Sequence, residues 1–124
     1  MAKFSLASAP KTFKRKVTIT LLDDSTADIE LTFKYKTRTE YAKLLDEVMK
    51  QDKVDESKTE SAVDIFKRLG AGTVEFLRKI VEGWDLDDEF NKSNVSELID
   101  KFPAAANEIT EAYRIAILEG RTKN

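Results

Sequence analysis

The side chains with the clearest capacity for chemistry are carboxylates, and they cluster where Glu82 is followed by four acidic residues within positions 85–89. Acidic clusters of this kind hold calcium when a glycine occupies the sixth position of the loop and a bidentate glutamate the twelfth. Counted from Asp85, those positions hold Phe90 and Ser96. The pattern therefore indicates a solvated acidic loop between helices, and we expect no metal site there.

The sequence also lacks two side chains that catalytic sites often use. The chain has no cysteine and no histidine, which excludes thiol nucleophiles, Ser-His relays, and metal sites built from thiolates or imidazoles. Paired carboxylates such as Asp87 and Asp88 need a cleft and a positioned nucleophile, and nothing in the sequence specifies either. The Gly-Ala-Gly segment at 70–72 has no following Lys-Ser or Lys-Thr pair, so it does not match a phosphate-binding loop. We expect a protein that is not an enzyme and holds no cofactor.

The densest run of basic side chains is Lys14, Arg15 and Lys16. This patch is small, and a net charge of −2 gives no general attraction to nucleic acid or to an anionic membrane. No apolar run approaches the roughly 20 residues of a spanning helix, and the first ten residues lack the apolar stretch of a secretory signal. We expect an intracellular protein without a nucleic-acid partner and without membrane insertion.

Apolar and polar residues alternate through two segments near the N-terminus, 17–21 and 29–36. This period of two is typical of strands with one buried face. Between the segments lies Asp-Asp-Ser-Thr at 23–26, whose side chains bond to nearby backbone and favour a turn. The pattern predicts a β-hairpin over residues 13–36. A lone hairpin is marginally stable, so its apolar face needs a cover, and we expect the next helix to provide it.

After residue 36 the apolar period becomes that of helices. A capping box, Thr-Arg-Thr-Glu, opens a predicted helix at 37–51. A long helix is predicted at 62–81, with a kink or a break at Gly70 and Gly72, because each glycine costs about 1 kcal/mol relative to alanine in a helix.

Two shorter helices complete the predicted elements. Residues 83–94 are predicted as a loop held by aromatic anchors. Ser93 or Asn94 suits the cap of a short helix, and Pro103 suits the start of a last helix that ends near Gly120.

These elements predict an α+β fold in which an N-terminal antiparallel β-hairpin packs against a C-terminal bundle of about four helices. Residues 1–12 lack a sustained period and are predicted as a mobile N-terminal arm. A length of 124 residues suits one domain. We therefore expect residues 13–124 to form a single α+β domain, with the hairpin at 13–36 and the helical part at 37–124.

The long helix carries Phe66, Leu69 and Phe76 at the three- to four-residue spacing of one helix face. Such a stripe usually packs in a core, but the helices carry more apolar positions than one hairpin face and one short helix need. A helix-binding groove or an oligomer interface is therefore an alternative. The single tryptophan, Trp84, is either an anchor for its loop or a hot spot of an interface. These four residues are our candidates for partner binding, and a homo-oligomer stays open.

Several short segments occur in an order that resembles one protein family. They are Phe-Lys-Arg-Lys-Val-Thr-Ile at 13–19, Gly-Trp-Asp at 83–85, Phe90, Asn-Val-Ser-Glu-Leu-Ile at 94–99, Phe-Pro-Ala-Ala at 102–105, and the helical stretch 109–113. Together they resemble the tail assembly chaperones of long-tailed bacteriophages. The similarity spans most of residues 13–124.

This resemblance implies a non-catalytic protein of the host cytoplasm that binds the tape measure protein and keeps it soluble. It further implies that the chaperone is displaced as tail tube protein polymerises around the client, and that it is absent from the mature virion. The resemblance provides no ligand residues to transfer, so the candidates for partner binding come from the chain's own apolar stripe and tryptophan. Two alternatives stay open: a structural virion or head–tail joining component, and a small phage regulatory protein.

Overall fold

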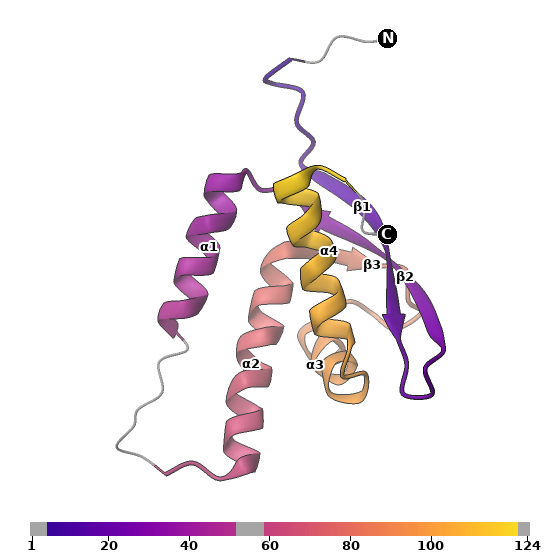
Figure 1. Ribbon diagram of the computed structural model, residues 1–124, viewed down its shortest axis with the longest axis vertical. Helices are drawn as coiled ribbons and strands as arrows, with labels where there is room; N and C mark the ends of the chain where they lie inside the picture. Colours follow the sequence, from indigo (N-terminus) through magenta and orange to yellow (C-terminus); the bar gives the residue numbers. More distant parts are fainter. Residues whose placement is uncertain (1–4, 52–58, 122–124) are drawn as a thin grey trace.

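The computed structural model describes residues 5–51 and 59–121 of the 124-residue chain. Within these ranges the elements follow in the order β1 (Thr12–Thr20), β2 (Thr26–Lys34), α1 (Arg38–Gln51), α2 (Ala62–Ile80), β3 (Val81–Trp84), α3 (Lys92–Lys101) and α4 (Ala105–Glu119). The three strands form one antiparallel sheet in the order β1-β2-β3, and the helices lie to one side of it (Figure 1). The predicted α+β class, with an N-terminal hairpin and four helices, is confirmed.

The first two strands form the predicted hairpin, paired in register along their full length. Short polar side chains build its turn, because the Asp23 carboxylate accepts hydrogen bonds from the hydroxyl and the backbone N–H of Ser25. These two bonds hold the pKa of Asp23 below its usual value. Asp24 takes the left-handed conformation, with φ 67°, which aspartate tolerates better than most residues. The turn is therefore specified locally.

The structure corrects the sequence prediction at strand β3. The sequence predicts the end of a helix and the start of a loop there, whereas Val81–Trp84 pair antiparallel with β2, with Val81 opposite Phe33. Asp85 continues the ladder, because its N–H donates to the Glu30 carbonyl and its carboxylate accepts from the Glu30 N–H. Glu30 and Asp85 are 55 positions apart in the sequence. Local periodicity does not report such a contact.

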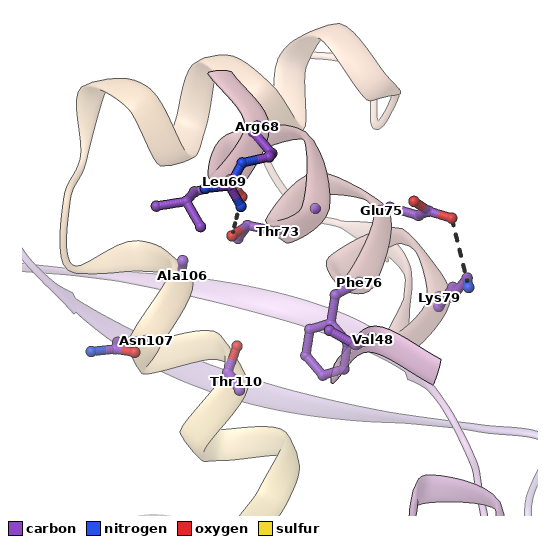
Figure 2. A pocket seen from close by; sticks show the side chains of 11 residues that line it. Val48, Arg68, Leu69, Thr73, Glu75, Phe76, Lys79, Ala106, Asn107 and Thr110 are labelled. Atoms are coloured by element: carbon purple, nitrogen blue, oxygen red, sulfur yellow. Dashed lines mark hydrogen bonds and ion pairs between the residues drawn. The ribbon is translucent and has the colours of Figure 1, made fainter. Parts of the chain in front are cut away.

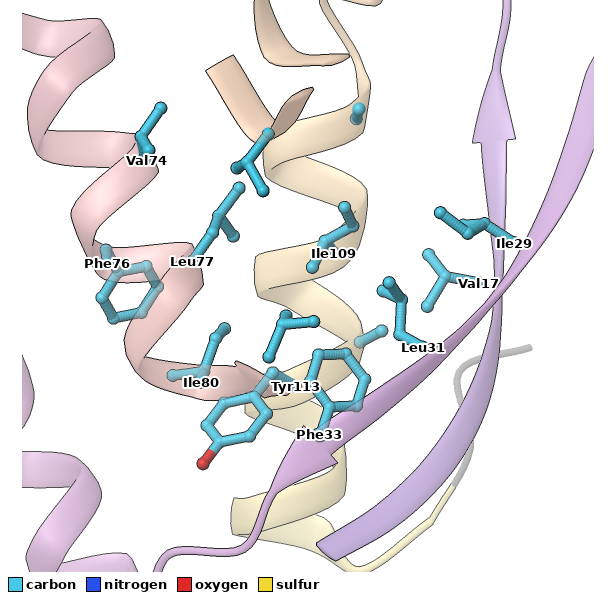
Figure 3. Packing of buried hydrophobic residues seen from close by; sticks show 14 of the residues in the cluster. Val17, Ile29, Leu31, Phe33, Val74, Phe76, Leu77, Ile80, Ile109 and Tyr113 are labelled. Carbon is cyan, nitrogen blue, oxygen red and sulfur yellow. The ribbon is translucent and has the colours of Figure 1, made fainter. Parts of the chain in front are cut away.

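Side chains from the inner face of the sheet and from all four helices form one apolar core. Figure 3 shows the part of this core where the sheet meets α2 and α4. Its largest fully buried side chains are Leu31, Phe33, Leu77, Ile80, Val95, Ile109 and Tyr113. The ring of Tyr113 lies 5.1 Å from that of Phe33, and its hydroxyl donates to the Lys34 carbonyl at 2.8 Å. Burial raises the pKa of Tyr113, because the phenolate form is poorly solvated there.

Helix α4 covers the hairpin, and the expectation that the helix after the hairpin would do so is wrong. α4 lies against β1 and carries five buried side chains, whereas α1 packs on α2 and α4 (Figure 1). Among the described residues of α1, only Tyr41 and Leu44 are buried. The edge of the Tyr41 ring meets Tyr113 at a centroid distance of 5.6 Å. With so few buried positions, α1 can cover only the outside of the other helices.

Helix α2 runs without interruption for 19 residues through Gly70 and Gly72, so the predicted break is wrong, while the alternative of a kink stays a prediction. Ser61 caps its N-terminus by accepting a hydrogen bond from the Asp64 N–H. The tertiary contacts of its C-terminal half outweigh the low helix propensity of the two glycines. No helix in the described part of the chain has the length and apolar character required to cross a membrane.

The ends of the last two helices differ slightly from the prediction. α3 is capped by Asn91, which precedes the predicted caps Ser93 and Asn94, and the Asn91 side chain accepts from the backbone N–H of Asn94. α4 begins at Ala105, two residues after Pro103. It ends at Gly120 as predicted, where φ 67° suits a residue without a Cβ atom.

The strand β1 begins at Thr12, so the last residue of the predicted arm belongs to the sheet. The Lys11 carbonyl also accepts a hydrogen bond from the Tyr35 N–H. Residues 1–4 lie outside the described residues, and the mobility of the arm and the division into 1–12 and 13–124 stay predictions.

Candidate partner-binding surface

Helix α2 changes its surroundings halfway along its length. Its C-terminal half buries Val74, Phe76, Leu77 and Ile80. Its N-terminal half extends past the N-terminal end of α4 (Figure 1), and four large apolar side chains are exposed there: Val63, Ile65, Phe66 and Leu69. We call these four residues the exposed α2 cluster. Apolar side chains gathered so closely on a surface are typical of an interaction site.

The structure separates the four residues that the sequence proposes for partner binding. Phe66 is 74% exposed and Leu69 is 43% exposed, so both belong to the exposed α2 cluster. Phe76 is 8% exposed and packs in the core. Trp84 lies in β3 and is half-buried. A ligand on the N-terminal half of α2 can therefore contact Phe66 and Leu69 directly.

Trp84 makes the contacts of a loop anchor. Its Nε1–H donates to the Asp88 carbonyl at 2.7 Å, and its ring meets Phe90 edge-on with a centroid distance of 5.0 Å. The Asn94 side chain donates to the Glu89 carbonyl at 2.7 Å and fixes the other end of the same turn. The acidic stretch is therefore a structured turn, and the described residues contain no cluster of His, Cys, Asp and Glu side chains arranged to hold a metal ion.

A groove of about 710 Å³ runs along one side of the N-terminal half of α2, between it and α3. We call it the α2–α3 groove. It is lined by Val63, Phe66, Lys67, Leu69, Gly70, Ala71, Thr73, Val74, Lys92, Ser96, Ile99, Asp100 and Ala106. Most of these side chains are apolar or small. Lys67 and Lys92 make no ion pair or side-chain hydrogen bond with the described residues, so their charges are available to a partner.

A second hollow, of about 280 Å³, lies on the other side of α2 and reaches α1 and α4 (Figure 2). We call it the α2–α4 pocket. Val48 and Phe76 lie together within it, whereas its rim is charged. The rim charges are largely paired: Lys79 lies 3.7 Å from Glu75, and the Arg68 Nε donates to Glu60 at 3.2 Å. This pocket therefore offers a smaller apolar area and fewer free charges than the α2–α3 groove.

Gly70 lines the α2–α3 groove and Gly72 lines the α2–α4 pocket. Two residues correspond to about 200° around a helix, so the two glycines face nearly opposite sides. A Cβ atom added to either would meet nothing within 4 Å, and neither has a positive φ. The fold of this chain therefore requires neither glycine, although each costs about 1 kcal/mol of helix stability relative to alanine.

The sequence pattern identifies part of this surface and misses the rest. Val63 and Ile65 widen the apolar stripe and carry a visible signal. Lys67, Lys92 and Ile99 carry no signal as site residues, because α3 comes beside α2 only through the tertiary fold. The glycines are visible, but their spacing suggests a kink and not a surface.

The basic run near the N-terminus does not form one patch. Lys14 and Lys16 are exposed, whereas Arg15 points to the other side of the strand, where its guanidinium lies 5.1 Å from the centroid of the Phe13 ring. The Lys14 Nζ atom lies 4.0 Å from the Oε1 atom of Glu30. This arrangement does not present a continuous basic face of the kind that binds nucleic acid.

Comparison with known protein families gives a match over the full length. A family model described as phage tail assembly chaperone matches residues 1–124, the whole chain. The match includes every element from β1 to α4. No curated protein and no solved structure matches the chain.

Proposed function

This chain belongs to the phage tail assembly chaperone family, and we propose that its client is the tape measure protein of the same phage. Family membership supports a role in phage tail assembly and suggests that this role is not enzymatic. The exposed α2 cluster is the observation that carries the choice of client. Before the tail tube closes around it, a long helical protein presents apolar helix faces to water, and an apolar surface of matching size can cover them.

The exposed α2 cluster suits reversible binding. Complete burial of a side chain such as Phe66 contributes about 1.5–3 kcal/mol, and a few such side chains give a favourable total of moderate size. Association entropy and side-chain ordering offset part of this gain. The net affinity is then low enough for polymerising tail tube protein to displace the chaperone. We place this cycle in the host cytoplasm, with the chaperone absent from the mature virion.

Co-expression tests the proposal directly. A tape measure fragment is produced with the wild-type chain or with a variant carrying Phe66→Ser and Leu69→Ser, and the soluble fraction of the fragment is measured. Leu22→Ser is the matched control, because Leu22 is 83% exposed but lies by the hairpin turn, far along the chain from α2. We expect the wild type and the control to keep the fragment soluble, and the double variant to lose this effect.

Two results would overturn the proposal. One is a fragment whose solubility is the same with and without the wild-type chain. The other is a double variant that keeps the fragment as soluble as the wild type does, while its circular dichroism shows a native helix content. Mass spectrometry of purified virions adds an independent check, because a chain present in fixed stoichiometry in finished tails would be a structural component.

A further inference from the structure

The two glycines of α2 occupy positions where the isolated chain has room for a larger side chain. A Cβ atom placed on Gly70 or Gly72 would have no neighbour within 4 Å, and neither residue uses a positive φ. Close approach of another backbone is one reason for a glycine that does not use a positive φ. No described segment of this chain provides that backbone at either glycine. Gly70 lines the α2–α3 groove and leaves room there for the backbone of a partner.

The α2–α3 groove is the side where a backbone can approach. Gly70, Ala71 and Ser96 are small residues that line the groove together with apolar side chains. From Val63 to Val74 the groove follows α2 for about 16 Å, at 1.5 Å per residue, which is the length of three helical turns. A helix with a small residue at the crossing point can therefore lie along it at the short end of the usual 8–10 Å axial separation.

The charged side chains of the groove indicate which charges a bound helix should carry beside its apolar stripe. Lys67 of α2 and Lys92 of α3 line the groove without partners among the described residues, and Asp100 is the one acidic side chain that lines it. The groove therefore has a net positive charge. A helix with acidic residues beside its apolar stripe complements these lysines, whereas one flanked by basic residues is repelled.

We infer that the α2–α3 groove receives one amphipathic, acid-flanked helix of the tape measure protein, whose backbone crosses α2 beside Gly70. This inference rests on the proposed function and adds the face, the crossing point and the charge of the client helix. Gly72 faces the α2–α4 pocket and takes no part in the contact.

A pair of alanine substitutions tests the crossing point. Gly70→Ala and Gly72→Ala both fit the free chain, so each should raise the melting temperature by about 2–4 °C through improved helix propensity. Only Gly70→Ala places a methyl group at the crossing point. We expect it to weaken binding of purified tape measure fragments about tenfold or more in titration calorimetry, and Gly72→Ala to leave binding unchanged.

A pair of charge reversals tests the flanks. Lys67→Glu combined with Lys92→Glu should weaken binding of the same fragments about three- to tenfold at low salt, with a smaller loss at high salt. Lys43→Glu on α1 is the control and should have no effect, because Lys43 is exposed outside the groove.

The outcomes separate the inference from the proposed function. If the wild type binds and Gly70→Ala binds equally well, the crossing point is wrong while the function stands. Equal losses from both glycine variants would overturn the choice of face. If the chain alone forms dimers that only Gly70→Ala disrupts in light scattering, a second copy occupies the groove and the client helix does not. If the wild type binds no tape measure fragment, the proposed function fails and the inference fails with it.

Discussion

The two halves of α2 carry similar apolar residues at similar spacing but lie in different surroundings. Leu77 and Ile80 in the C-terminal half are buried against the sheet and α4, whereas Val63 and Phe66 in the N-terminal half face solvent. One helix therefore takes part in the core at one end and presents an apolar surface at the other. Helical periodicity reports which side of a helix is apolar, and only the tertiary fold decides whether this protein or a partner covers it.

The largest difference should appear when buried and exposed side chains of α2 are truncated. Leu77→Ala should lower the free energy of unfolding by about 2–5 kcal/mol, because Leu77 is 2% exposed and its loss leaves a cavity. Urea unfolding followed by the fluorescence of Trp84 measures this. Val63→Ala is the matched variant in the exposed half and should change stability by less than about 0.5 kcal/mol. Similar losses from both variants would show that the N-terminal half is also part of the core.

The hairpin turn and strand β3 show which parts of the fold can be predicted from the sequence. The turn is predictable because Asp23 and Ser25 make their bonds within three residues. Strand β3 is not, because Val81 pairs with Phe33, far away in the chain, and nothing in residues 81–84 alone requires that pairing. Sequence order likewise suggests the wrong helix as the cover of the hairpin. Local interactions are readable from the sequence, while long-range pairing is decided by competition among elements.

The candidate site follows the same rule. Phe66 and Phe76 are indistinguishable in the sequence, since both lie on the same apolar stripe. The fold buries Phe76, which is 8% exposed, and leaves Phe66 74% exposed. The contribution of α3 to the groove, through Lys92 and Ile99, cannot be predicted before α3 is placed beside α2.

A second prediction uses the tyrosine buried in the core next to the C-terminal half of α2. The pKa of Tyr113 is raised in the folded state by burial, so above its ordinary pKa of about 10 the unfolded chain loses this proton first. The contribution of Tyr113 to the free energy of unfolding is therefore complete below pH 10. It declines as the pH rises further, by about 1.4 kcal/mol per pH unit. Burial also raises the pKa of Tyr41, so part of the decline remains without Tyr113.

Urea unfolding between pH 8 and pH 11 measures this effect. Tyr113→Phe should lower the free energy of unfolding by about 1 kcal/mol at pH 8, because the hydrogen bond to the Lys34 carbonyl is lost. The free energy of unfolding of this variant should also decline less steeply above pH 10 than that of the wild type. Phe66→Ala, in the exposed half, should keep the wild-type slope. A Tyr113→Phe variant with the wild-type slope would place the alkaline sensitivity elsewhere.

A third prediction concerns local opening of the exposed half. Ser61 holds the first turn of α2 through the Asp64 N–H, and Ser61→Ala should weaken that turn by about 1 kcal/mol. Few buried contacts support residues 62–69, so we expect their amides to exchange with solvent faster than those of 74–80, and the variant to widen this difference. Hydrogen exchange with mass spectrometry resolves the two segments. Uniform exchange along α2 would mean that the halves unfold together.

The smallest expected change in stability comes from Phe66→Ala. Phe66 is 74% exposed, so its removal loses little buried area, while alanine is the better helix former; the free energy of unfolding should stay within about 0.5 kcal/mol of the wild type. The same variant should lose most of its effect on tape measure solubility. Such a separation distinguishes a binding surface from a core, because the side chain contributes to a complex and not to the fold. A loss above about 2 kcal/mol would instead place Phe66 in the stabilising contacts of the monomer.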